Sequence, residues 1–156
     1  MAPNSVLMAL VAFVAVFGLG AGTADAATNY PCGTGWPGVC GAIGDHYYQP
    51  GIGVSLGCPT TWEYTPPGQS PNRAQDFQAG LIWWNPTAGT YATWGDIAWK
   101  WRNQCGGING VLGPPDSDEY WAGNVRRSIF WNGYIDWNPN NRQMVATDWF
   151  GRTNVC

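Results

Sequence analysis

A motif that occurs twice at a fixed spacing constrains this chain more than any other feature. The pattern Phe-x-x-Gly-x-Ile-x-Trp-Asn-Pro occupies residues 77–86 and again residues 130–139, an offset of 53 positions. A second pattern, Leu-Gly-x-Pro followed by Glu, occupies residues 56–63 and recurs at 112–119. Duplication at this period predicts one supersecondary unit used twice, each copy burying part of its apolar face against its neighbour. A residue present in both copies is therefore most simply explained by the fold.

The first 26 residues have the pattern of a secretory signal peptide. Residues 6–19 are almost wholly apolar and lead into Ala24-Asp25-Ala26, a small-x-small cleavage site. The apolar run is short for a membrane span, which needs about 20 residues. We therefore predict cleavage after Ala26 and no membrane attachment thereafter, with an uncleaved anchor as the alternative. The predicted organisation is a signal peptide at 1–26, an N-terminal arm at 27–40 and one repeat domain at 41–156.

Charge and cysteine content exclude several function classes. Without Asp25, which lies in the signal, nine acidic side chains face seven basic ones. This charge is too weak and mixed to capture nucleic acid. No C-x-x-C pair is present and His46 is the sole histidine, so we predict no zinc site, no other metal and no cofactor.

All the cysteines follow the predicted signal, as expected of a protein in an oxidising compartment. The five are Cys32, Cys40, Cys58, Cys105 and Cys156. An odd number leaves one thiol free or in an intermolecular bridge, and the sequence does not choose among the pairings. A homo-oligomer linked by a disulfide or by repeat contacts is compatible with this pattern.

Each copy is predicted to contain a β-hairpin. Asn132-Gly133 between aromatic residues is a strong two-residue turn signal. Such a turn pairs Phe130 with Ile135, and the period of two along a strand then places Trp137 on the same face. Because these residues are repeated, we expect their face to be the core and Trp84→Ala or Trp137→Ala to unfold the domain. The predicted repeat core consists of Phe77, Ile82, Trp84, Phe130, Ile135 and Trp137.

A helix of about ten residues is predicted between the hairpins. Thr93 and Asp96 form a start similar to a capping box, and Gly106-Gly107 follows as a stop signal. Residues 41–47 align with residues 95–101, which predicts an equivalent helix in the first copy.

These elements predict an α+β fold, mainly β, built from a short helix, a Leu-Gly turn and a hairpin. The predicted units are 41–92, 93–144 and a partial copy at 145–156, in which Trp149 and Phe150 supply the apolar side.

These units resemble LGFP repeats, a family of secreted and cell-surface proteins of actinobacteria. The resemblance spans about residues 41–150 and is carried in the second copy by Gly95-x-Ile97, Gly106-Gly107-x-x-Gly110-x-Leu112-Gly113-x-Pro115, Glu119 and the hairpin from Phe130 to Trp137. Cys58 and Pro114 depart from the tetrapeptide that names the family. The resemblance implies attachment to the cell envelope, since such repeats are usually appended to wall-modifying enzymes and are thought to hold them to wall polysaccharide. Propeller-blade-like units in one compact, disulfide-containing domain are the expected architecture, and two and a half units cannot close a ring.

Aromatic content gives a physical argument for binding. Eleven Trp and seven Tyr exceed what a core of this size needs, and exposed aromatic faces suit sugar rings, whose axial C–H groups pack on them. Trp131 and Tyr134 are predicted to be cross-strand partners on the face opposite the core. The alternative is that these rings pack against neighbouring units or the arm. The candidate ligand-binding residues, chosen because they lack a counterpart in the other copy, are Trp131, Tyr134, Trp83, Trp62, Trp121 and Trp36.

No catalytic residue is predicted. Glu63 and Glu119 could act as an acid and base pair, but as repeat equivalents they are expected to cap or hydrogen-bond a turn. Asp116, Asp118 and Glu119 cluster as calcium ligands do, yet their spacing fits no established loop, so we expect a solvated turn.

His46 aligns with Lys100 and is expected on a helix surface, without the motif of a serine or cysteine nucleophile nearby. Arg126-Arg127 could pair with anionic wall polymers, although two charges at the start of a strand are ordinary.

The sequence therefore predicts a secreted, wall-associated, non-catalytic protein that binds cell-wall polysaccharide through exposed Trp and Tyr. Two alternatives stay open. One is a small secreted glycan hydrolase that uses Glu63, Glu119 or an Asp, and the other is a secreted inhibitor or interaction module that recognises a protein through the same aromatic side chains.

Overall fold

Short helices and two antiparallel sheets make up the chain in a computed structural model that describes Cys32 and residues 35–156. The predicted signal peptide and most of the first part of the arm lie outside the described residues. Strands predominate over helices, as expected. The elements are α1 (Gly41–Tyr47), α2 (Ile52–Leu56), β1 (Arg73–Asp76), β2 (Gly80–Asn85), β3 (Gly89–Trp94), α3 (Gly95–Asn103), the 3₁₀-helix η2 (Gly107–Asn109), β4 (Tyr120–Ala122), β5 (Val125–Phe130), β6 (Gly133–Trp137) and β7 (Met144–Asp148).

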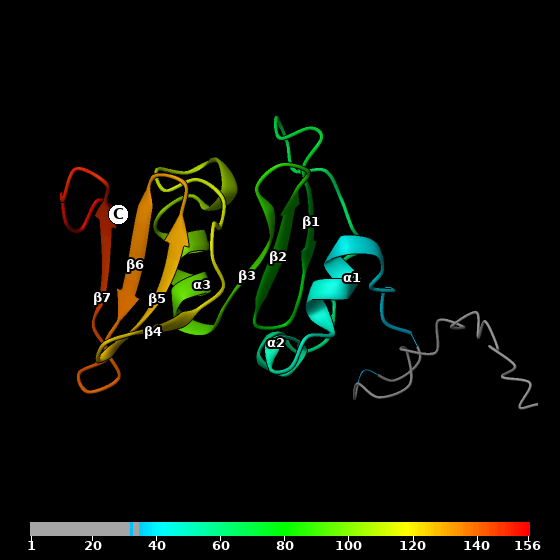
Figure 1. The fold of residues 1–156 in the computed structure, drawn as a ribbon, viewed down its shortest axis with the longest axis horizontal. Helices are drawn as coiled ribbons and strands as arrows, with labels where there is room; N and C mark the ends of the chain where they lie inside the picture. The colour runs from blue at the N-terminus through cyan, green and yellow to red at the C-terminus, as the bar shows by residue number, and fades with distance from the viewer. Residues whose placement is uncertain (1–31, 33–34) are drawn as a thin grey trace, which may run out of the picture.

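Helix α3 lies between the two sheets along the long axis of the molecule (Figure 1). The first sheet has the order β1-β2-β3 and the second the order β4-β5-β6-β7. One core cluster joins α1 and α2 to the first sheet, and a second cluster joins that sheet to α3 and the second sheet. The first sheet is thus buried on both faces. Over residues 35–156 the sheets stay open, and no barrel or propeller closes.

Membrane spans were sought in the described part of the chain, and none of its helices is long and apolar enough to cross a bilayer.

The hairpins of the two halves of the chain point in opposite directions. The turn between β1 and β2 lies beside α2 at one edge of the molecule, whereas the turn between β5 and β6 lies at the opposite edge (Figure 1). Backbone N–H groups tie each turn to its own Leu-Gly segment, from Ala79 to the Leu56 carbonyl (2.8 Å) and from Asn132 to the Leu112 carbonyl (2.9 Å). Equivalent surfaces of the two halves therefore face opposite edges.

The predicted hairpin register is wrong by two residues. Phe130 pairs with Gly133 rather than with Ile135, so the turn consists of Trp131 and Asn132. Gly133 is needed for close approach, because a Cβ there would lie 2.1 Å from the Thr147 carbonyl oxygen of β7. A shift of two preserves the side-chain parity of a strand, so the predicted face still points into the core.

Four of the six predicted core residues are buried. Phe77, Ile82, Phe130 and Ile135 are between 0% and 4% exposed. Trp84 and Trp137 are only partly buried and pack at the margins of the two clusters. These two pair across the sheet with Arg73 and Arg126, whose side chains are 39% and 23% exposed. Their replacement is therefore expected to weaken the fold rather than to unfold it.

The alignment of α1 with α3 is confirmed. Ile43 and Ile97 are each 1% exposed, and Tyr47 and Trp101 are 2% and 1% exposed. The predicted capping box is wrong, because α3 starts at Gly95 without a side-chain cap. Thr93 instead lies buried within β3.

Residues 145–156 do not begin a third helical unit. Met144–Asp148 forms β7, the edge strand paired with β6, and residues 149–156 form a turn and a loop. Strands β3 and β7 were not predicted, so each expected hairpin belongs to a larger sheet.

Two disulfides attach terminal segments to the body of the fold. Cys32 bonds to Cys58 beside the first Leu-Gly turn, and Cys156 bonds to Cys105 at the end of α3. Cys40 is free and exposed. Cys156 is therefore used within the chain, and Cys40 is the thiol that remains for any intermolecular bridge.

Candidate functional site

The carboxylate of Asp148 fixes a sharp turn after β7. Its Oδ1 accepts hydrogen bonds from the backbone N–H groups of Phe150 (3.0 Å) and Arg152 (2.9 Å), and Arg152 Nε donates to its Oδ2 (2.6 Å). Burial opposes ionisation, but these hydrogen bonds and the guanidinium charge outweigh it and lower the pKa of Asp148. The turn is therefore held by an ionised carboxylate and presents Trp149 and Phe150, which are 55% and 87% exposed.

This turn forms one wall of a groove on the second half of the chain. We call it the C-terminal groove; it has a volume of about 760 Å³ and is lined by Val111, Asn132, Asp148, Trp149, Phe150, Arg152, Thr153 and Val155. Trp149 Nε1 donates to the Trp131 carbonyl (2.8 Å), and the Trp149 ring lies 5.8 Å from that of Tyr134. Two of the six predicted aromatic residues thus contact Trp149, although neither lines the groove itself.

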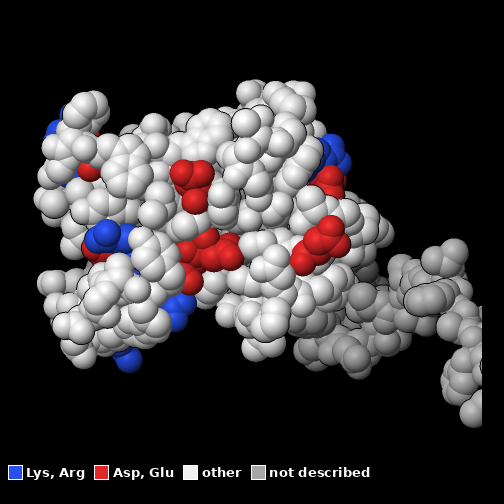
Figure 2. Space-filling view, in the orientation of Figure 1, with Lys and Arg blue, Asp and Glu red and all other residues white. Residues whose placement is uncertain are grey.

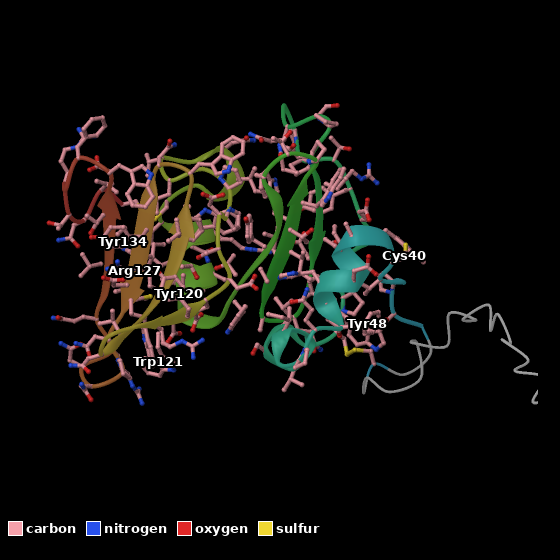
Figure 3. The ribbon with its side chains drawn as sticks, in the orientation of Figure 1. Cys40, Tyr48, Tyr120, Trp121, Arg127 and Tyr134 are labelled. Atoms are coloured by element: carbon pink, nitrogen blue, oxygen red, sulfur yellow. A yellow bond between two sulfur atoms is a disulfide. The ribbon has the colours of Figure 1, made fainter. Side chains whose placement is uncertain are left out.

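Tyr134 lies on the outer face of the second sheet, beside a charged pair. Arg127 donates two hydrogen bonds to Asp136 (2.6 and 2.7 Å), which raises the pKa of Arg127, and its guanidinium lies 3.9 Å from the centre of the Tyr134 ring. Figure 3 shows Tyr134, Arg127 and Tyr120 along this sheet. Tyr134 pairs with Ile129 and not with Trp131, so the predicted cross-strand pair does not form. The guanidinium covers part of the ring that was expected to receive a ligand.

Trp83 is wrongly predicted as an exposed candidate. Its side chain is 0% exposed in the cluster around α3, and its ring packs edge-on against Trp131 at 5.4 Å. The cross-strand pair Ala74 and Trp83 of the first sheet corresponds in register to Arg127 and Asp136 of the second. Helix α3 covers the pair in the first sheet, which is apolar. It does not cover the pair in the second sheet, which is charged.

The three other predicted aromatic residues are exposed but lie apart from the C-terminal groove. Trp62 and Trp36 are 70% and 42% exposed, and a Cβ on Gly38 of the arm would lie 3.5 Å from the Trp62 ring. Trp121, 57% exposed, has the Arg126 guanidinium 5.1 Å from its ring centre. The structure therefore does not gather the six predicted residues into one platform.

A family model of the LGFP repeat matches residues 56–107. The chain contains an LGFP repeat. The resemblance stated from the sequence is thereby confirmed. A search of the curated proteins found no match. The matched span begins at the first Leu-Gly turn, includes the whole first sheet and ends after α3.

Both repeated glutamates of this LGFP-repeat chain are held by arginines. Glu63 Oε1 lies 2.6 Å from Arg73 Nε, and Glu119 Oε1 lies 2.9 Å from Arg126 Nε. Burial raises the pKa of Glu119, an effect that the neighbouring Arg126 opposes. Because the ion pair itself occurs in both halves, it is best explained by the fold.

His46 is buried, contrary to the prediction of a surface residue. Its Nε2 lies 2.8 Å from Asp118 Oδ1, which also accepts a hydrogen bond from the Ala92 backbone N–H (2.8 Å). Asp118 therefore joins α1 and β3 to the second half of the chain. Across the residues that the structure describes, no group of three His, Cys, Asp or Glu side chains is placed to hold a metal ion.

Trp149 and Phe150 were not predicted as binding residues, because the repeat pattern assigns them to the apolar side of a third unit. A local signal was available. Asp148 and Gly151 stand at the first and fourth positions of a four-residue segment, which is the composition of a type I turn. The Gly151 N–H donates to the Asp148 carbonyl (3.0 Å), as such a turn requires.

Proposed function

We propose that this LGFP-repeat protein is a secreted, non-catalytic protein that binds cell-wall polysaccharide, and that the C-terminal groove is its binding site. The observation that supports the proposal most is the exposed pair Trp149 and Phe150 on a turn fixed by Asp148. Rings held in place before binding lose little conformational entropy when a ligand packs on them. Asn132 and Arg152 line the same groove and offer polar groups to sugar hydroxyls.

We further infer that residues 41–92 and 93–144 are two copies of one propeller-blade-like unit. Gly57 and Gly113 both have a φ of 72°, and the leucine before each is 0% exposed. The N-terminal arm and the C-terminal loop, each attached by a disulfide, then act as caps on an open array of units.

The alternatives make different predictions for the carboxylates. A hydrolase needs a carboxyl group free to exchange a proton, whereas Glu63 and Glu119 are both engaged by arginine. Glu→Gln changes that abolish glycan turnover but leave binding intact would favour the hydrolase. If neither sugar binding nor turnover is found, a protein partner that recognises the same aromatic side chains becomes the leading proposal.

The first test is retention of the oxidised protein on insoluble actinobacterial cell wall, before and after mild acid strips the attached polysaccharide. We expect retention on intact wall and loss of retention on stripped wall. Retention that survives stripping would point to the remaining wall network as the ligand. An absence of retention on both materials would contradict envelope binding.

Phe150→Ala and Trp149→Ala should each lower wall retention by about tenfold, the effect expected when a binding hot spot is truncated. Phe150 is 87% exposed, so its removal should leave the melting temperature unchanged. Val54→Ala, at a side chain that is 80% exposed on α2, is the matched control and should bind as the unaltered protein does. Equal retention of all three variants would place the site elsewhere.

A further inference from the structure

A second groove lies between the β1–β2 turn and α3. It has a volume of about 360 Å³, and we call it the α3 groove; it is lined by Phe77, Gln78, Ala79, Gly80, Gly95, Asp96, Ala98, Trp99, Arg102 and Asn103. Trp99 is 53% exposed in it, a value close to that of Trp149 in the C-terminal groove. Nothing in the proposed function uses this second groove.

The two grooves share their construction. Each lies between the hairpin turn of one sheet and the segment that follows the last strand of that sheet, α3 after β3 and residues 149–155 after β7. In each, an exposed tryptophan is followed three residues later by an arginine, as Trp99 by Arg102 and Trp149 by Arg152. The α3 groove therefore contains the same two residue types as the first site, an exposed tryptophan and an arginine paired with an aspartate, although Trp99 lies within α3 and Trp149 directly follows β7.

The charges in both grooves indicate a neutral occupant. Arg102 Nη2 donates to Asp76 Oδ1, and Arg152 Nε donates to Asp148 Oδ2 (2.6 Å), so both guanidinium groups are already neutralised. Five of the seven basic side chains make such pairs with carboxylates, namely Arg73, Arg102, Arg126, Arg127 and Arg152. Asp96, in contrast, lines the α3 groove and has no basic partner in the described part of the chain. On the face of the molecule drawn in Figure 2, acidic side chains lie near the middle and no broad basic patch is present. An anionic polymer would meet no free positive charge in either groove, whereas sugar hydroxyls can donate to Asp96.

The grooves open at opposite edges of the molecule. The C-terminal groove includes Asn132 of the β5–β6 turn, and the α3 groove includes Gln78 and Ala79 of the β1–β2 turn. These turns lie at opposite edges because the hairpins of the two halves point in opposite directions (Figure 1). We therefore expect the two grooves to hold separate polymer strands.

We propose that the α3 groove is a second site for the same neutral glycan and that one protein molecule bridges two polysaccharide strands. This inference rests on the proposed function. Two sites facing apart convert a simple binder into a cross-linker, because each molecule holds two strands at once. Each site alone still binds, whereas bridging needs both.

The experiment compares binding with cross-linking. The probe is the soluble polysaccharide that mild acid releases from actinobacterial cell wall, mixed with oxidised protein that carries Cys40→Ser to exclude disulfide-linked dimers. Light scattering measures cross-linking, and retention on the immobilised polysaccharide measures binding. Trp99→Ala, Trp149→Ala, the double variant and the Val54→Ala control are compared, with melting temperatures to show that each is folded.

We expect the Cys40→Ser protein and the Val54→Ala control to raise the scattering. Each single tryptophan variant should lose the scattering while keeping binding weakened by about tenfold, and the double variant should lose both. If Trp99→Ala kept full scattering and Trp149→Ala lost binding, the C-terminal groove would be the single site. That result would overturn the inference but leave the proposed function intact. Binding to polygalacturonate that is tighter than binding to the released polysaccharide, and that salt abolishes, would contradict the inference that the ligand is neutral. Absence of binding in the unaltered protein would contradict the proposed function itself.

Discussion

Replacing Trp101 with alanine should remove about 4–8 kcal/mol of folding stability, a large part of the total. Trp101 is 1% exposed, its ring stacks on Phe130 at 5.6 Å, and its Nε1 donates to the Gly113 carbonyl (2.9 Å). Truncating a buried tryptophan costs about 3–5 kcal/mol, and the orphaned carbonyl adds about 1–3 kcal/mol. Domains of this kind have a total stability of about 5–15 kcal/mol. Urea denaturation followed by circular dichroism measures the loss.

Trp99→Ala is the matched control, two residues away on the same helix. Trp99 is 53% exposed, so its replacement should change the free energy of unfolding by no more than about 0.5 kcal/mol. If the two variants lost similar stability, α3 would not be the helix that both sheets share.

Removing the Cys105–Cys156 disulfide should have the second largest effect. The bond closes a sequence separation of 51 residues, and the chain-entropy model assigns such a loop about 4 kcal/mol of stabilisation. A protein with Cys105→Ser and Cys156→Ser should therefore unfold at a lower urea concentration. It should also bind wall more weakly, because residues 149–156 would keep only non-covalent contacts, such as the packing of Val155 on the core and the hydrogen bond from Lys100 Nζ to the Cys156 carbonyl (2.7 Å).

Two comparisons make this prediction specific. Cys40→Ser should leave stability unchanged, since Cys40 is free and exposed. Removing the Cys32–Cys58 bond, with a separation of 26 residues, should cost about 0.6 kcal/mol less than removing the longer loop. A double variant of Cys105 and Cys156 as stable as Cys40→Ser would show that the C-terminal loop holds its place without the bond.

Much of the core could be predicted from duplication alone. An apolar residue kept in both copies indicates a buried position, so Ile43 and Ile97 identify each other, as do Ile82 and Ile135. The same reasoning failed for the hairpin turn. A glycine that permits close approach of two backbones looks the same in sequence as a glycine that permits a tight turn, and Gly133 serves the first purpose.

The candidate site was harder to predict, because the duplication describes each copy and not its surroundings. Trp83 lacks an aromatic counterpart because α3 covers one sheet face, whereas no helix within residues 35–156 covers the equivalent face of the second sheet. A residue without a counterpart in the other copy is therefore as readily explained by different neighbours in the fold as by a ligand site. Trp149 and Phe150 lie where the pattern of the repeat stops, and only the local turn chemistry of Asp148 identifies them.

The positions of the two disulfides determine how the chain would respond to mechanical tension. A pull applied at Cys32 and Cys156 passes through the bonds to Cys58 and Cys105, so the residues inside each covalent loop carry none of the load along their backbone. Only the segment between Cys58 and Cys105, which contains the first sheet and α3, can be drawn out. All the residues that line the C-terminal groove, including its aromatic turn, lie inside the second covalent loop. A pull applied at the groove itself would pass along residues 150–156 and through the bond to Cys105. Under the proposed function, the middle of the chain would then extend while the second covalent loop stays closed.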